Sequence, residues 1–475
     1  MWQNSLKLVV LFTLLLGLIV ACERPSANET ALNIQLLNSL TTTPLDATPT
    51  LANTALPTLF LQETAVSPAV TTTPTLTPTP FFSDAVSTPC GVLLPLLPSN
   101  TTVTTSSLTP NRSAIAAVEA ILPEAAVPAW KQLLSSPDSV GLIVYRVGDE
   151  ANGIYHNADM QMPLASIVKL IYLVAYAEAA AAGELDPTSY VPLTTLDNIY
   201  LPGYDLGAHN LAIEELSQAD LVLPNPERIR LEDVPWMMIR HSANTASDYL
   251  HGLLGQEVIE ETAVSLNLSQ QTAPCTFLGQ FLAMSNQTRQ GSSDRAAIQA
   301  YLEAPASYGA EVALLADAYQ LDTSFREAER EYHQEERRPS PQDQRFFSQT
   351  LNAHGTPREY AALMAQIAQN GLSNPESSFL ARRYLEWPMI FPANQERFSN
   401  LGYKNGSLPG ILNSAYYAYP LGEETSTIVI LFFRDLPRSS YRTWRFTLPH
   451  DEFARWLLDN PEAIATLRQA LTPIP

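Results

Sequence analysis

The sequence predicts an α+β fold, in which an antiparallel sheet built from N- and C-terminal strands is flanked by helices and joined to an all-helical subdomain. Two segments rich in β-branched and aromatic residues, 140–147 and 154–159, surround a Gly- and Asp-containing turn and indicate an early hairpin. Two more strand-like segments, 412–419 and 427–433, lie near the C-terminus. The long Ala- and Leu-rich stretch between them is helical in composition, so we expect the last strands to rejoin the first hairpin in one sheet.

The first 22 residues read as a secretion signal. Lys7 precedes an apolar run, 8–20, which is too short for a comfortable bilayer span. The run closes in Ala21-Cys22, which resembles a bacterial lipoprotein signal that would place a lipid on Cys22. The alternative is an uncleaved anchor that happens to end in Cys. Both interpretations place the rest of the chain outside the cytoplasm, so we expect an extracytoplasmic protein anchored to the bacterial cell membrane through its N-terminal lipid.

Residues 23–110 form a Thr/Pro-rich segment, purest at 71–80. Such a composition cannot bury enough apolar surface to offset its ordering entropy, so we predict a disordered tether. The folded domain is then 111–475, with an insertion at about 280–350. Formal net charge is −21 and the pI is about 4.7, which argues against nucleic acid as a partner. We expect a monomer without a cofactor.

Two of the three cysteines remain after Cys22, namely Cys90 and Cys275. In an export compartment they could form a disulfide that ties the end of the tether to the folded domain. Two free thiols are the alternative that the residues leave open. Cysteines so far apart in the chain give no indication of a metal site, and we expect none.

Each element of the domain has a local signature. Residues 113–121 and 129–134 are helical, and the hairpin 140–159 follows. The run 163–183 is a helix that is apolar nearly all round and ends at a Gly, so it should be buried. Residues 185–233 carry several prolines and predict short helices and irregular structure. A second helical block, 234–254, is interrupted by the polar run His241-Ser-Ala-Asn.

The second half begins with the insertion, where 309–318 is a helix and the charged run 326–338 is a solvated helix face. Thr356, Pro357 and Glu359 are the N-cap, first position and capping-box residue of a helix that ends near Asn370. Residues 400–409 are polar and Gly-rich and should precede the strand 412–419. After the strand 427–433 the chain closes with helical sequence, 450–471, broken at Pro461.

A serine and a lysine interrupt the buried helix near its start. Ser166 and Lys169 are three residues apart, which puts both side chains on one helical face. A lysine surrounded by apolar residues is disfavoured in its charged form, so its pKa should fall and it can accept a proton. A serine beside such a base is an activated nucleophile. The alternative is a helix cap followed by a lysine whose amine reaches the solvent.

Three motifs follow one another in a fixed order: Ser166-Ile-Val-Lys169, Ser242-Ala-Asn244 and Lys404-Asn-Gly406. This set resembles the penicillin-recognising serine enzymes, the class A β-lactamases and D,D-peptidases, whose signatures are S-x-x-K, S-D-N and K-T-G. The context of each motif and the Thr356-Pro-Arg-Glu segment are also similar to that family. The resemblance covers roughly Val140 to the C-terminus and implies a serine β-lactamase-like catalytic domain.

The resemblance implies a role for each motif residue. Ser166 would be the acylated nucleophile and Lys169 the base, while Ser242 would relay a proton and Asn244 would orient Lys169 and substrate. Lys404 would hold the substrate carboxylate. The backbone N–H groups of Ser166 and Ser407 would form the oxyanion hole next to Gly406. The substrates would be β-lactams or D-Ala-type cell-wall peptides.

The sequence departs from the family pattern in three places. Ala243 and Asn405 replace the usual Asp and Thr, although neither middle position makes the essential contacts. Class A β-lactamases also carry a Glu that activates the deacylating water, and its expected place, 275–285, contains no carboxylate. The insertion offers Glu303, Glu311, Asp317 and Glu327, none of which can be assigned.

Two other interpretations remain open. Lys404-Asn-Gly could be a hairpin turn, because Asn-Gly is a strong turn signal. The whole domain could also be a non-catalytic envelope lipoprotein that uses the fold as a binding or sensing module. The intact Ser166 and Lys169 pair favours the enzyme, because a degenerate domain would be free to lose it.

Overall fold

A computed structural model describes residues 86–88, 91–93, 111–272, 274–289, 293–334 and 339–471. All of them belong to one unit, Pro80–Pro475. The predicted signal peptide, with Cys22, lies outside the described residues, as does most of the predicted tether. Within the described ranges, no helix is both long and apolar enough to cross a bilayer.

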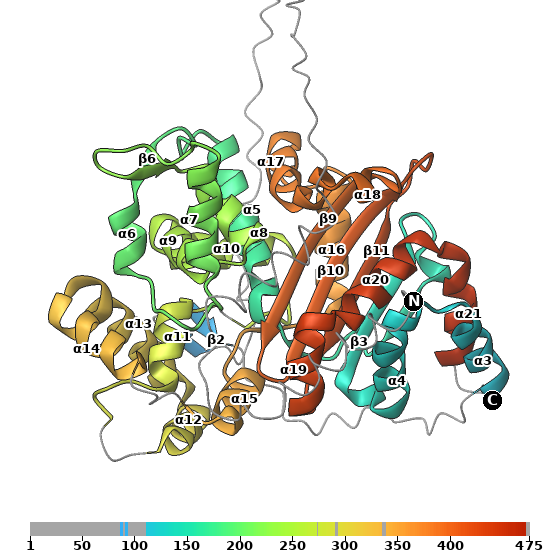
Figure 1. Ribbon diagram of the computed structural model, residues 1–475, viewed down its shortest axis with the longest axis horizontal. Helices are drawn as coiled ribbons and strands as arrows, with labels where there is room; N and C mark the ends of the chain where they lie inside the picture. Colours follow the sequence, from blue (N-terminus) through green and yellow to red (C-terminus); the bar gives the residue numbers. More distant parts are fainter. Residues whose placement is uncertain are drawn as a thin grey trace, which may run out of the picture. The chain divides into compact units, whose positions relative to one another are not determined.

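A five-stranded antiparallel sheet organises the domain (Figure 1). Its order is β4-β3-β11-β10-β9, so the two early strands stand beside the three late ones. The junction is the β3–β11 ladder, in which Val144 pairs with Val429 and Leu142 with Leu431. The prediction of an α+β fold with one sheet from both ends of the domain is therefore confirmed. The strands are β3 (Val140–Arg146), β4 (Ile154–His156), β9 (Phe398–Leu408), β10 (Ile411–Pro420) and β11 (Thr427–Phe433).

Three two-stranded ladders lie outside this sheet. They are β1 (Val86–Thr88) with β2 (Gly91–Leu93), β5 (Met162–Pro163) with β8 (His354–Gly355), and β6 (Tyr190–Pro192) with β7 (Arg228–Arg230). The first pair falls inside the segment predicted to be a disordered tether, so that prediction is wrong for this hairpin. The hairpin contacts the helices α10 (Gln256–Ser265) and α13 (Pro305–Leu321), and this packing supplies the order that its composition does not predict.

Helices from the two ends of the domain cover one face of the sheet. Trp130, Phe453 and Leu457 lie in the same buried cluster as Leu142 and Leu431 of the sheet. The C-terminal helical sequence is broken at Pro461, as predicted, because a proline lacks the N–H that would continue the helix. These helices are α3 (Arg112–Ile121), α4 (Val127–Ser135), α19 (Arg438–Thr447), α20 (Pro449–Asp459) and α21 (Pro461–Leu471).

The opposite face packs on α16 (Pro357–Ala368), which joins the sheet to the helical subdomain (Figure 1). The N-cap of α16 is Thr356, whose hydroxyl accepts from Glu359 N as predicted. At the centre of the subdomain is α5 (Lys169–Ala181), whose first nine residues are all buried. The other helices of this side are α6 (Leu193–Asn198), α7 (Ala208–Gln218), α8 (Asp233–Arg240), α9 (Asn244–Leu254), α11 (Phe277–Met284), α17 (Pro375–Leu385) and α18 (Pro392–Gln395).

Short 3₁₀ helices connect several elements. They are η2 (Glu124–Ala126), η3 (Pro137–Ser139), η4 (Glu150–Asn152), η5 (Ala165–Val168) and η6 (Trp387–Ile390). The predicted insertion contains α12 (Asp294–Glu303), α13, α14 (Thr323–Gln334) and α15 (Pro341–Thr350).

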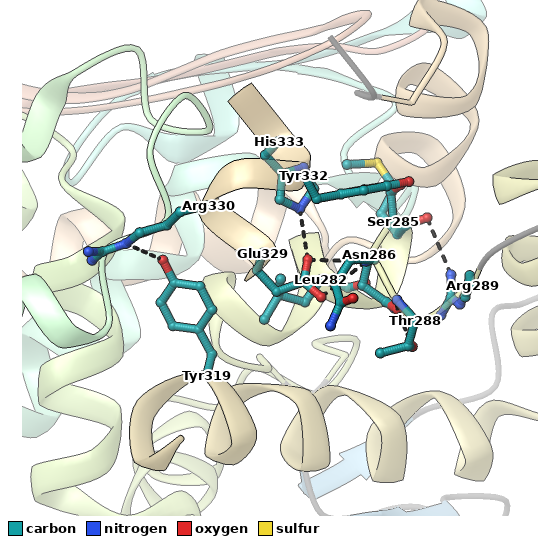
Figure 2. Close-up of polar contacts among 12 residues, drawn as sticks. Leu282, Ser285, Asn286, Thr288, Arg289, Tyr319, Glu329, Arg330, Tyr332 and His333 are labelled. Atoms are coloured by element: carbon teal, nitrogen blue, oxygen red, sulfur yellow. Dashed lines mark hydrogen bonds and ion pairs between the residues drawn. The ribbon is translucent and has the colours of Figure 1, made fainter. Parts of the chain in front are cut away.

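The charged helix α14 is solvated on one face, where Glu327 and Glu331 are exposed, but its other face is buried, which its sequence did not predict. Glu329 is 0% exposed and His333 is 3% exposed. Figure 2 shows both side chains directed toward the chain around Asn286, where Gln287 N donates to Glu329 at 3.1 Å. The His333 Nε2 atom lies 3.5 Å from the Glu329 carboxylate, and the Nδ1 atom contacts the Tyr204 hydroxyl at 3.0 Å. The prediction failed because these charges find partners on other elements, which composition does not reveal.

Candidate active site

Ser166 lies in a tight turn between β5 and α5. It belongs to η5, so the predicted helix starts as a 3₁₀ turn and becomes an α-helix at Lys169. Ala165 precedes it with a φ of +48°, in the left-handed region that non-glycine residues seldom adopt. The turn and the three-residue spacing place Ser166, which is partly exposed, on the same face as Lys169.

Lys169 is completely buried, with 0% of its surface exposed. Its Nζ atom donates to Ser242 O at 2.6 Å and to Asn244 Oδ1 at 2.8 Å, and it lies 3.4 Å from Ser242 Oγ. Burial lowers the pKa of Lys169 to about 7, against the attraction of Asp248 and Asp205, which raises it. A neutral amine is therefore accessible near neutral pH, as a general base requires.

Ser242 and Asn244 lie at the junction of α8 and α9. Ser242 has a φ of +62°, and this conformation turns the chain between the two helices. Asn244 is the first residue of α9, and its Nδ2 donates to Tyr204 O at 3.4 Å. One side of the Asn244 amide thus contacts Lys169 while the other holds the loop that carries Tyr204.

Lys404 approaches Ser242 from the sheet. It is 1% exposed, and its Nζ donates to Ser242 Oγ at 2.9 Å and to Asn405 O at 2.8 Å. Burial, together with the charge of Lys169, holds the pKa of Lys404 well below its usual range. The Ser242 hydroxyl therefore lies between two buried amines, an arrangement suited to proton relay.

The Lys404-Asn-Gly segment lies inside β9, not before a strand as its polar composition predicted. Asn405 pairs with Ser414 and Gly406 with Asn413 on β10. The interpretation of this motif as a hairpin turn is also wrong, because β9 continues to Leu408 before β10 begins at Ile411. A polar segment forms a strand here because alternate residues, Lys404 and Gly406, are buried against the turn that carries Ser166, while Asn405 between them is exposed.

Gly406 and Ser407 define the edge of β9 that faces the turn carrying Ser166. A Cβ atom on Gly406 would lie 2.5 Å from Leu164 O and 3.2 Å from Ile167 N, so only glycine allows this approach. The Ser407 hydroxyl contacts the Tyr441 hydroxyl of α19 at 3.3 Å. The strand backbone after Gly406 therefore runs directly beside the turn that carries Ser166.

Phe277 occupies the space next to Lys169. The Nζ atom lies 4.6 Å from the centroid of the Phe277 ring, which is 2% exposed. The start of α11 is fixed by Asp248, whose two carboxylate oxygens accept from Phe277 N at 2.6 Å and Leu278 N at 2.8 Å. Burial raises the pKa of Asp248 to about 7, although these two N–H donors and Lys169 lower it. An aromatic ring, with no carboxylate beside it in 275–285, thus covers the Lys169 amine.

The carboxylates of the insertion lie elsewhere. Within the described part of the chain, none of Glu303, Glu311, Asp317 and Glu327 forms a hydrogen bond or ion pair with Ser166 or Lys169. Glu311 lies 4.0 Å from Arg289. Asp317 lines a cavity of about 460 Å³ that also contacts Thr276 and Leu278 but not Phe277. The structure therefore assigns none of these four to the site.

Cys275 is disulfide-bonded, so the alternative of a free thiol does not hold at this position. Cys90, its expected partner, lies outside the described residues. The pairing of Cys90 with Cys275 stays a prediction. The described ranges contain no group of three or more His, Cys, Asp or Glu side chains placed to hold a metal ion.

The structure adds residues that sequence reasoning missed. Asp248 had a usable signal, because it lies four residues after Asn244 and so shares its helical face. No sequence signal pointed to Phe277, Tyr204 or Asn352. They lie on other segments of the chain and reach the site through packing or a single hydrogen bond.

The sequence model of the Beta-lactamase enzyme family matches residues 128–440. Comparison with curated sequences gives no significant match.

Several solved structures are similar at low identity. A β-lactamase from Sphaerobacter thermophilus is 17% identical, with 76% of this chain and 99% of that chain covered and a TM-score of 0.42. The structure of PBP-A is 14% identical, with 74% of this chain and 98% of that chain covered and a TM-score of 0.39. A β-lactamase from Desulfarculus baarsii is 15% identical, with 70% of this chain and 97% of that chain covered and a TM-score of 0.40. Because the family model matches more than half of the sequence, the chain belongs to the β-lactamase enzyme family of penicillin-recognising serine hydrolases.

Proposed function

We propose that this protein is a class A-like serine hydrolase that forms an acyl-enzyme with β-lactams or with D-Ala-type cell-wall peptides. The observation that carries the proposal is the buried Lys169 amine, which shares Ser242 with Lys404 and lies three residues from Ser166. Two amines buried around one hydroxyl cost free energy in a purely structural role, which favours a catalytic one.

In the acylation step the neutral Lys169 amine accepts the hydroxyl proton of Ser166, directly or through a water molecule. Ser166 Oγ then attacks the carbonyl carbon of the substrate amide and forms a tetrahedral intermediate. The backbone N–H groups of Ser166 and Ser407 stabilise its oxyanion. Losing one such donor typically lowers a rate by about 10²–10³.

Collapse of the intermediate breaks the C–N bond, and the leaving nitrogen takes a proton from the Ser242 hydroxyl. The protonated Lys169 returns a proton to Ser242, from which its Nζ lies 3.4 Å. Lys404, at 2.9 Å from Ser242 Oγ, binds the substrate carboxylate when charged and favours proton release by that hydroxyl. The net result is an ester on Ser166 and a free amine.

Deacylation is the step for which the site is poorly equipped. A hydrolytic water beside Lys169 would need a general base, but the Phe277 ring occupies that space. We therefore expect a long-lived acyl-enzyme, with weak β-lactamase turnover or peptidase-like action. We also propose that the protein acts outside the cytoplasmic membrane, held there by a lipid on Cys22.

The test is covalent labelling of the full-length protein, purified in detergent, by a fluorescent penicillin. We expect one adduct per chain on Ser166, none in Ser166→Ala, and acylation of Lys169→Ala slowed by about 10²–10⁴, the usual contribution of a general base. No label on the folded unaltered protein at saturating reagent would refute the acyl-enzyme and favour a non-catalytic binding module.

A further inference from the structure

The turn before the nucleophile is held in an unfavourable conformation. Ala165 is completely buried and has a φ of +48°. A left-handed conformation costs a residue with a Cβ about 1–2 kcal/mol. Such a conformation persists only when its surroundings enforce it, so the contacts of Ala165 decide the geometry of the following residue, Ser166.

One side chain holds the Ala165 amide. Asn352 Oδ1 accepts a hydrogen bond from Ala165 N at 2.9 Å. Asn352 is 4% exposed, and its Nδ2 faces Gln280 Oε1 at 3.4 Å. Gln280 in turn donates to Cys275 O at 2.8 Å. Both ends of the Asn352 amide are therefore engaged inside the protein, and its orientation is fixed.

The chain around Asn352 runs alongside the nucleophile turn. Leu164 N donates to Ala353 O at 2.8 Å, and the β5–β8 ladder pairs Pro163 with His354. Asn413 contributes from the sheet, where its Nδ2 donates to Pro163 O at 2.8 Å and Leu164 O at 3.1 Å. These contacts fix the chain up to Leu164, and Asn352 fixes the next residue.

We propose that Asn352 is a positioning residue for the nucleophile, which keeps Ala165 left-handed and so aims the N–H and the hydroxyl of Ser166 at the substrate carbonyl. The proposal rests on the acylation proposed above. Asn352 lies two residues after the end of α15, just beyond the predicted insertion. The inserted helices therefore return to the site through a residue that holds the left-handed turn before Ser166.

The direction of the effect follows from the geometry of the peptide group between Ala165 and Ser166. The N–H vector of Ser166 rotates with the ψ angle of Ala165. Without an acceptor for its own N–H, Ala165 relaxes toward the ordinary region and takes the oxyanion donor with it. A displacement of about 1 Å in a catalytic group can lower a rate by about 10²-fold.

The test compares three variants of the full-length protein. Asn352→Leu has similar volume but no acceptor, whereas Asn352→Asp keeps an oxygen for Ala165 N. Asn394→Leu is the control, because Asn394 is also buried, at 3% exposure, and bonded on both sides, to Pro388 O and Arg455 at 2.7 Å each. The measurements are the first-order acylation rate at saturating fluorescent penicillin and the half-saturating concentration.

We expect Asn352→Leu to lower the first-order acylation rate by about 10–100-fold with little change in half-saturation. Asn352→Asp should stay within about fivefold of the unaltered protein, and Asn394→Leu should affect thermal stability more than rate. Equal acylation rates in folded Asn352→Leu and the unaltered protein would overturn the proposal, as would loss of rate in Asn394→Leu to the same extent.

Amide hydrogen exchange separates this proposal from the proposed function. If the unaltered protein is not acylated at all, the proposed function fails, but the peptide covering 162–168 still reports on the turn. We expect its exchange to be at least tenfold faster in Asn352→Leu only. Unchanged exchange in that variant would show that Asn352 does not hold the turn.

Discussion

Replacing Phe277 with a carboxylate should convert a slow acyl-enzyme into one that turns over. The ring centroid lies 4.6 Å from Lys169 Nζ, so a carboxylate in its place would sit beside the base and the ester carbonyl region. A positioned general base typically accelerates proton transfer by about 10²–10⁴. We therefore expect Phe277→Glu to hydrolyse its penicilloyl ester about 10²–10⁴ times faster.

The same substitution should also slow acylation at neutral pH. Two unit charges 4.6 Å apart attract each other by about 3.6 kcal/mol at an effective dielectric constant of about 20, equivalent to a rise of nearly 3 in the pKa of Lys169. This is an upper bound, because the new side chain admits water. Less Lys169 is then neutral at pH 7. We therefore also expect the pH dependence of the acylation rate to shift to higher pH.

Phe277→Leu is the control, because it removes the ring without adding a carboxylate. Both variants lose the contact of the ring with the Lys169 amine, which is worth about 1–2 kcal/mol when buried. The assay is pulse-labelling with fluorescent penicillin followed by loss of the adduct, resolved by intact mass. A folded Phe277→Glu protein that acylates but releases the adduct no faster than Phe277→Leu would refute the reasoning.

Three further predictions follow from the same geometry. Acylation should rise as the pH passes about 7, the pKa of Lys169, because the neutral amine is the proposed base. Asp248→Asn removes a charge that raises this pKa, so the rise should move to lower pH in a stopped-flow pH profile. Gly406→Ala should slow acylation at least about tenfold, since its Cβ would overlap the nucleophile turn at 2.5 Å, whereas Gly252→Ala, which meets nothing within 4 Å, should acylate normally. Glu329→Leu should lower the free energy of unfolding by about 1–3 kcal/mol in a denaturant titration, because it removes the buried acceptor of the Gln287 N–H at 3.1 Å, and an unchanged midpoint would contradict that role.

Much of the fold and the candidate site follows from patterns that are local in the chain. The strands β3, β10 and β11 are indicated by their β-branched and aromatic residues, and the start of α16 by its N-cap Thr356, although Glu359 bonds Ser269 and Gln270 and does not complete the predicted capping box. The Ser166–Lys169 spacing places two side chains on one face wherever the helix lies. Local patterns failed where partners come from elsewhere, as at the buried Glu329 of α14 and in the polar Lys404 segment of β9.

The sequence alone determined the fold class, the order of the three motifs and the burial of Lys169, because periodicity, caps and spacing are properties of neighbouring residues. Only the tertiary structure decided what surrounds that base. It brought Lys169 and Lys404 to opposite sides of Ser242 and set the Phe277 ring where a carboxylate was expected. It also placed Asn352, which follows the insertion, in hydrogen-bonding contact with the turn that carries Ser166. The physical reason is that these contacts join residues separated by up to 187 positions, as from Ala165 to Asn352, and only packing of the sheet against the helical subdomain brings them together.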